Sequence, residues 1–151
     1  MQIGLMLSVS EDANGTIEKV VESAKNAEHE GFDSLWMAHL FGLDAVTTLA
    51  IIGQATKSIR LGSAVTPTYP RHPRALAQQA LTTGAACQGR FTLGIGLSHQ
   101  VVIENMLGLS YSKPARHMKE YLAILLPLLR GEKVSFQGQN YTINQVKLAL
   151  P

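Results

Sequence analysis

The stretch Ile59-Arg60-Leu61-Gly62-Ser63-Ala64-Val65-Thr66-Pro67 decides the fold. Its residues 59–65 form a short apolar run, which predicts a buried strand. Residues 66–73 contain three prolines and are therefore expected to form a loop. Residues 74–88 then have the periodicity of a helix. A strand, a long loop and a helix in this order make one unit of a parallel α/β sheet.

The same unit recurs on both sides of this stretch. Three further strands are expected, at residues 2–8, 34–38 and 90–97. Three further helices are expected, one between Thr16 and Gly31 and the others at residues 44–57 and 114–130. The alternation βαβαβαβα predicts a parallel sheet with right-handed crossovers, covered by its helices. Residues 133–136 and 140–143 follow as a hairpin.

Long loops come after the expected strands rather than after the helices. They span residues 9–13, 39–43, 66–73 and 98–113. Active sites of α/β folds lie at the carboxyl ends of the strands. These four loops are therefore expected to form the functional face.

Composition narrows the class of protein. The chain has 151 residues, 46% of them hydrophobic, and a net charge of +2. This length fits one domain with a real core, and the small charge argues against a nucleic-acid partner. The single cysteine, Cys87, excludes an internal disulfide framework and a cysteine-based zinc site.

The targeting signals point the same way. Residues 1–7 lack the basic start and long apolar run of a secretory leader. No uncharged apolar stretch approaches the ~20 residues that span a bilayer. We therefore expect a cytoplasmic protein with no membrane partner.

The chain carries several ordered motifs, namely Gly31-Phe32-Asp33-Ser34-Leu35-Trp36, the stretch 59–67, Arg71-His72-Pro73 and Gly89-Arg90-Phe91-Thr92-Leu93-Gly94-Ile95-Gly96. Together they resemble the luciferase-like monooxygenase superfamily. The runs at residues 96–100 and 114–118 are most similar to its coenzyme F420-dependent oxidoreductase branch. This resemblance covers essentially the whole chain. It implies a TIM-type (β/α)8 barrel that binds a deazaflavin, or FMN in sister branches, at the carboxyl face.

Length is where the chain departs from this family. A complete barrel needs about 250 residues. Four β/α units and a hairpin like the family's insertion before strand five imply an N-terminal half-barrel, residues 1–151 as one domain. Its two exposed sheet edges favour pairing with another chain. We expect a homo-oligomer or a complementary C-terminal half-barrel as partner.

The resemblance also implies a cofactor site. Ala64 and Val65 align with a backbone bulge behind the deazaflavin ring, often with a cis bond, and Thr66 extends this ring support. Gly96 and Ser98 would line the ring, because small residues at a strand end admit a ligand close to the backbone. The alternatives are an ordinary buried strand end and glycine packing inside the barrel.

His39 follows the second strand and is the candidate for proton transfer. Relatives often have an acidic residue directly before this histidine, whereas this chain has Ala38, so Asp44 would have to replace it. The alternative is that His39 caps the helix at residues 44–57. The five histidines show no close pairing, so no metal site is expected.

Three functions remain open at this level. The first is an F420-dependent oxidoreductase that transfers a hydride between the cofactor and a small organic substrate, inactive alone if truncated. The second is an FMN-dependent monooxygenase of the same fold. The third is a non-catalytic half-barrel that acts as an assembly module.

Overall fold

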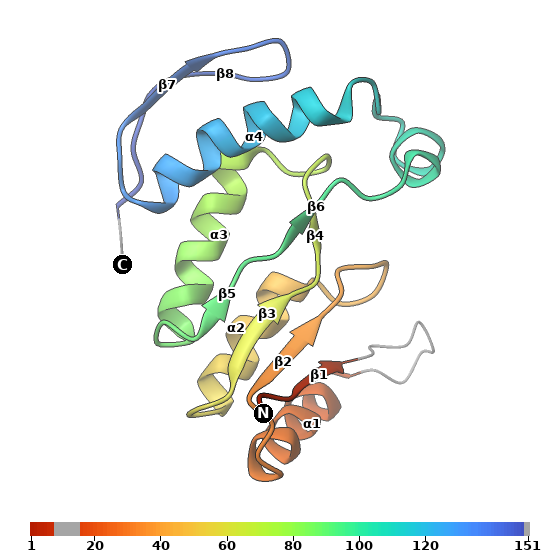
Figure 1. Cartoon of the computed structure of the whole chain (residues 1–151), viewed down its shortest axis with the longest axis vertical. Helices are drawn as coiled ribbons and strands as arrows, with labels where there is room; N and C mark the ends of the chain where they lie inside the picture. Colours follow the sequence, from red (N-terminus) through yellow and green to blue (C-terminus); the bar gives the residue numbers. More distant parts are fainter. Residues whose placement is uncertain (8–15, 150–151) are drawn as a thin grey trace. The chain divides into compact units, whose positions relative to one another are not determined.

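The structure is a computed structural model that describes residues 1–7 and 16–149. The expected loop at residues 9–13 lies outside the described residues. The chain, whose helices and strands are labelled in Figure 1, divides into two compact units. The first comprises Met1–Thr66 and Thr82–Ile95, and the second comprises Pro67–Leu81 and Gly96–Pro151.

A four-stranded parallel sheet organises the first unit. Its strands, in spatial order, are β1 (Gly4–Leu7), β2 (Ser34–Met37), β3 (Arg60–Ser63) and β5 (Phe91–Thr92). The register aligns one apolar row across all four strands, formed by Leu5, Leu35, Leu61 and Phe91. Because side chains alternate along a strand, this row faces one side of the sheet. The expected parallel α/β alternation is confirmed.

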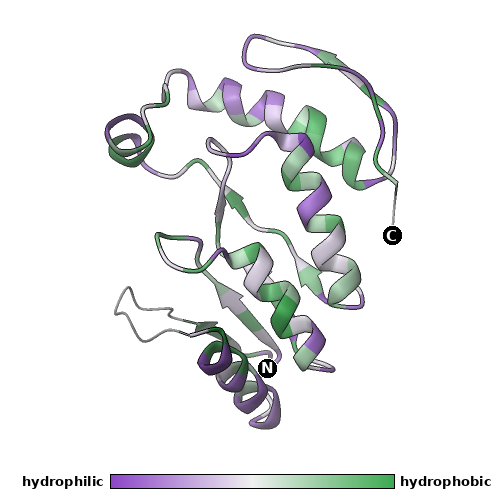
Figure 2. Ribbon diagram, turned by 180° about the vertical axis from the view of Figure 1, so that it is seen from behind, coloured by the Kyte–Doolittle hydropathy of each residue, from purple (hydrophilic) through white to green (hydrophobic). Residues whose placement is uncertain are grey.

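Helices α1 (Ile17–His29) and α2 (Ala45–Ala55) supply the helical side of the hydrophobic core of the first unit. The visible side of α1 is mainly hydrophilic, whereas apolar residues dominate the middle of α2 (Figure 2). The helical residues in the buried cluster are Val20, Ala24, Ala27, Ala45, Leu49 and Ile52. Cys87 belongs to the same cluster and is fully buried, as expected for a small apolar residue.

The second unit holds two helical elements and a hairpin within its described residues. They are the π-helix η1 (Val101–Met106), helix α4 (Pro114–Leu129) and the antiparallel hairpin β7 (Val134–Gln137) with β8 (Thr142–Val146). Helix α3 (Pro73–Ala86) begins in this unit and ends in the first one. The Glu120 carboxylate accepts hydrogen bonds from the backbone N–H groups of Gln139 and Asn140, which fixes the hairpin turn to α4.

Two expectations about the loops were wrong. The stretch 66–73 contains the short strand β4 (Thr66–Pro67), and the stretch 98–113 contains η1. The residues of β4 form a strand rather than a loop because they pair with β6 (Ile95–Gly96). η1 forms around Ile103, which is fully buried. Burial of this side chain stabilises η1, although the local sequence has only a weak preference for a regular element.

The expected strand at residues 90–97 is interrupted. It divides into β5 and β6, with Gly94 between them. A Cβ atom on Gly94 would overlap the carbonyl oxygen of Ser63. The backbones of β3 and the 90–97 segment therefore approach so closely here that regular pairing ends.

At the amino end of β3, a carboxylate ties α1 to the sheet. Glu28 accepts hydrogen bonds from the N–H groups of Lys57, Ser58 and Ile59 and from the Ser58 hydroxyl, at 2.6–3.1 Å. Partial burial by itself would raise the pKa of Glu28, but the hydrogen bonds from Ile59, Ser58 and Lys57 outweigh it and lower the pKa to about 2. The charged carboxylate is thus part of the folded structure.

We predict that Glu28→Gln lowers the free energy of unfolding by about 1–3 kcal/mol, because an amide replaces a multiply bonded carboxylate. The folded-state pKa lies below its ordinary value of 4.5, so the stabilisation is present above that pH and is lost as the pH falls towards about 2. Urea unfolding at pH 7 and at pH 3 measures both effects. The matched control is Glu22→Gln, on the exposed side of α1. An equal loss in the two variants would contradict the role of Glu28.

Candidate cofactor-binding site

The end of β3 carries a backbone bulge. The peptide bond between Ala64 and Val65 is cis, at the position that the sequence resemblance predicted. Val65 is 45% exposed, whereas Ser63 before the bulge and Thr66 after it are buried. The bulge therefore presents one apolar side chain to the surroundings.

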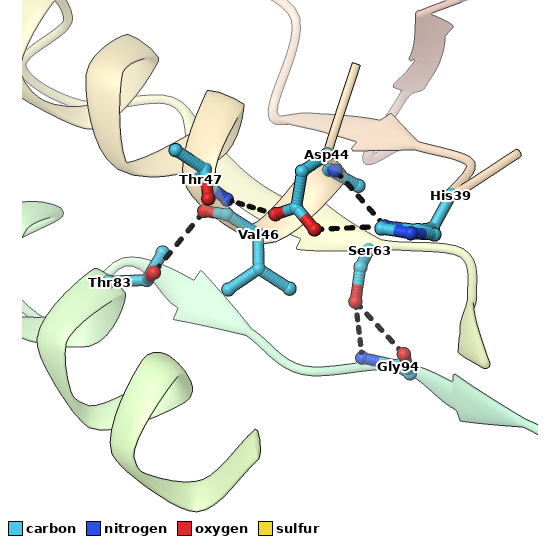
Figure 3. A network of polar contacts seen from close by, with 8 residues as sticks. His39, Asp44, Val46, Thr47, Ser63, Thr83 and Gly94 are labelled. Carbon is cyan, nitrogen blue, oxygen red and sulfur yellow. Dashed lines mark hydrogen bonds and ion pairs between the residues drawn. The ribbon is translucent and has the colours of Figure 1, made fainter. Parts of the chain in front are cut away.

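Gly94 holds both ends of this bulge, and Figure 3 shows its two bonds to Ser63. The Ser63 hydroxyl donates to the Gly94 carbonyl oxygen at 2.9 Å and accepts from the Gly94 N–H at 3.1 Å. The Thr66 N–H donates to the same carbonyl oxygen at 2.8 Å. On the other side, the Ala64 N–H donates to the Met37 carbonyl oxygen at 2.8 Å. These four bonds fix the backbone on both sides of the bulge.

Thr66 has a buried polar atom that no described residue satisfies. Its side-chain oxygen has no hydrogen-bond partner within the described parts of the chain, and the residue is fully buried. Buried hydroxyls nearly always have a partner. An apolar bulge beside such a hydroxyl fits the edge of a flat ring that carries hydrogen-bonding groups.

His39 lies just after β2 and caps α2. Its Nδ1 accepts a hydrogen bond from the Ala45 N–H at 3.2 Å, and the Asp44 Oδ2 lies 3.6 Å from the same nitrogen (Figure 3). The Asp44 Oδ1 accepts from the Thr47 N–H at 2.8 Å, so Asp44 is the N-cap of α2. The structure shows the capping alternative, with Asp44 beside the ring, and the role of His39 in proton transfer stays a prediction.

This geometry defines the protonation state of the His39 ring. Because Nδ1 accepts from a backbone N–H, the neutral ring carries its proton on Nε2. The Asp44 Oδ2, 3.6 Å from Nδ1, is the acidic neighbour of this ring, and the His39 side chain is 13% exposed.

Gly96 and Ser98 belong to the second unit. The Gly96 carbonyl oxygen accepts from the Thr68 N–H at 3.0 Å and from the Thr68 hydroxyl at 3.3 Å. Ser98 adopts a left-handed backbone conformation with φ of 62°, and its carbonyl oxygen accepts from the Tyr111 hydroxyl at 3.3 Å. The structure thus groups Ala64, Val65 and Thr66 in one unit and Gly96 and Ser98 in the other.

Sequence reasoning missed the partners that hold these residues. The roles of Ser63 and Thr68 were not foreseen, although each stands next to a predicted site residue or in its loop. Each bonds a glycine about thirty positions further along the chain, at separations of 31 and 28 residues. A hydroxyl residue paired with a glycine in the following strand is the signal that could have found them. Among the described residues, no three potential metal ligands converge on one point.

The parallel α/β sheet and the apolar bulge at the end of its third strand are the features that the resemblance to luciferase-like monooxygenases predicted. The luciferase-like monooxygenase family model matches residues 1–150, and the chain belongs to this family. The fold agrees with this assignment. The F420-dependent tetrahydromethanopterin reductase of Methanopyrus kandleri superposes with a TM-score of 0.83, at 21% identity over 98% of this chain and 46% of that one.

Two curated relatives are closer in sequence. The 5,10-methylenetetrahydromethanopterin reductase of Methanolobus tindarius is 33% identical over 87% of this chain and 40% of its own length. A putative coenzyme F420-dependent oxidoreductase of Mycobacterium tuberculosis is 36% identical over 78% of this chain and 34% of its own length. The chain therefore spans less than half the length of the relatives that it matches.

The contact at Gly94 yields a test by substitution. We predict that Gly94→Ala lowers the free energy of unfolding by about 1–3 kcal/mol, because the new methyl group meets backbone that cannot yield. The matched control is Gly84→Ala in α3, where a Cβ atom meets nothing within 4 Å. That change is expected to stabilise the helix by about 0.5–1 kcal/mol. Urea unfolding of both variants measures the difference, and equal effects would contradict the close approach.

Proposed function

We propose that this chain is the N-terminal half of a luciferase-like (β/α)8 barrel and forms the ring-binding part of an F420-dependent oxidoreductase. The reaction is hydride transfer between the cofactor and a small organic substrate. The observation that carries the proposal is the apolar bulge at Ala64 and Val65, clamped by Gly94 and followed by the buried Thr66 hydroxyl without a described partner. The names of the relatives favour F420 over FMN.

The residues divide the work as follows. F420, when bound, supplies the hydride chemistry. Ala64 and Val65 would support the ring of a bound F420 through backbone and methyl groups, and the Thr66 hydroxyl would be available to hydrogen-bond it. Gly96 and Ser98 are the cofactor residues that the sequence predicts in the second unit. His39 would be the proton-transfer residue through Nε2, the ring nitrogen that does not accept from the Ala45 N–H, with Asp44 beside the ring.

Completion of the barrel needs further strands. The described sheet ends at β1 on one side and at β5 on the other. Unpaired strand edges bind other strands through their free N–H and C=O groups. We propose that a complementary C-terminal half-barrel or a second copy of this chain supplies them. The alternative is that the chain is a non-catalytic half-barrel that pairs with such a partner as an assembly module.

Titration of F420 against FMN, followed by visible absorbance, tests the cofactor. We predict that F420 binds more tightly, and that Val65→Glu weakens its binding at least about tenfold by placing a charge against the ring. The matched control is Ile51→Glu, at a 40% exposed position on α2, which should bind as the unaltered chain does. Light scattering on the same sample reports its mass. A dimer or a completed barrel that binds neither cofactor would contradict the proposal, and tighter FMN binding would favour the FMN-dependent monooxygenase alternative.

Two substitutions separate the capping role of His39 from proton transfer. His39→Asn keeps an acceptor near the Ala45 N–H and should retain the stability of the fold. His39→Leu removes the cap and should cost about 1 kcal/mol. Both lack the Nε2 proton, so both should lower turnover of F420 with 5,10-methylenetetrahydromethanopterin, the compound named in one relative, by about 100-fold. Unchanged turnover in His39→Asn would show that His39 caps α2 and takes no part in proton transfer.

A further inference from the structure

His117 is a buried histidine of α4 that the proposed reaction does not use. It is 4% exposed. Its Nε2 lies 2.9 Å from the Thr68 side-chain oxygen, and its Nδ1 lies 3.5 Å from the Tyr141 hydroxyl. The ring stacks on Tyr69 with a centroid distance of 3.8 Å and an interplanar angle of 2°. All of these residues belong to the second unit.

The number of hydrogens that each group carries decides which group donates in these contacts. The Gly96 carbonyl oxygen can only accept, so the Thr68 hydroxyl uses its single hydrogen to reach it. The Thr68 oxygen must then accept from His117, which requires a proton on Nε2. Nδ1 of the neutral ring is left to accept from the Tyr141 hydroxyl. The hydrogen bonds therefore run from Tyr141 through His117 and Thr68 to Gly96.

The surroundings favour the neutral ring that this chain of bonds requires. Burial lowers the pKa of His117, and the negative charge of Glu120 opposes that shift without cancelling it. Glu120 itself is engaged by the N–H groups of Gln139 and Asn140. The aromatic neighbours Tyr69, Tyr121 and Tyr141 have hydroxyls whose pKa values are raised, first by burial, so they stay uncharged.

We propose that His117 is a positioning residue that fixes the Gly96 peptide through Thr68, with Tyr141 holding the ring in place. Thr68 donates to the Gly96 carbonyl oxygen twice, from its N–H and from its hydroxyl. In a trans peptide the C=O and the following N–H point in opposite directions. Fixing the Gly96 carbonyl towards Thr68 therefore turns the Leu97 N–H away from it. The link to a cofactor rests on the proposed function of Gly96 and Ser98.

Simple packing is the competing explanation, and two variants distinguish it. His117→Phe keeps a ring that can stack on Tyr69 but removes both hydrogen bonds, and leaves the Thr68 oxygen without its donor. His117→Gln places an amide N–H close to the position of Nε2. If His117 only packs, the Phe variant should behave normally. If it positions Gly96, the Gln variant should restore what the Phe variant loses.

Thr68→Val examines the same link from its other end, because it removes the hydroxyl with little change of shape. We expect it and His117→Phe each to speed hydrogen exchange at the Leu97 amide and to weaken F420 binding about tenfold. The double variant should be no worse than either single one, because both break one chain of bonds. His29→Phe, at an exposed position of α1, is the matched control and should change neither quantity.

Nitrogen NMR of the imidazole and amide hydrogen exchange, both on the full chain, decide the proposal without cofactor. A proton on Nε2 at neutral pH and faster Leu97 exchange in His117→Phe support it. A proton on Nδ1, or unchanged exchange in both His117→Phe and Thr68→Val, would overturn it. Absence of F420 binding by the unaltered chain contradicts the proposed function instead, and these two readouts still decide the role of His117.

Discussion

The Gly94 carbonyl oxygen accepts hydrogen bonds from both sides of the bulge, from the Ser63 hydroxyl and from the Thr66 N–H. Because both bonds converge on one atom, the chain between them must depart from the regular hydrogen-bond pattern of paired strands. Ala64 and Val65 are thereby displaced, and the Val65 side chain stays accessible. The same close approach excludes a side chain at residue 94 and ends the pairing of β5. The proposed site depends on this one contact.

Stability and chemistry are placed at opposite ends of β3. At its amino end, Glu28 binds three consecutive backbone N–H groups and joins α1 to the sheet. At its carboxyl end, the bulge and its partners serve the proposed cofactor. This separation is typical of β/α barrels, in which one face maintains the fold and the other carries the loops of the site. Glu120 uses the same kind of carboxylate-to-backbone contact in the second unit, where it holds the hairpin turn.

His39 and His117 use their two nitrogens in a similar way. In each ring Nδ1 accepts, from the Ala45 N–H or from the Tyr141 hydroxyl, which leaves the proton on Nε2. Their surroundings then separate their roles. His39 is partly exposed and stands beside the Asp44 carboxylate. His117 is buried among tyrosines and its pKa is lowered, so it stays neutral and directs a hydroxyl.

The order of strands and helices followed from the sequence alone, because strand and helix periodicities are local properties of the chain. The family and the place of the bulge at Ala64 and Val65 followed from the motifs, and Asp44 was foreseen as the neighbour of His39. Only the tertiary structure decided why residues 90–97 form two short strands and what holds Gly96. Gly94 meets a serine 31 residues away, and His117 meets Thr68 across 49 residues. No local pattern records such partners, because folding alone brings them into hydrogen-bonding distance.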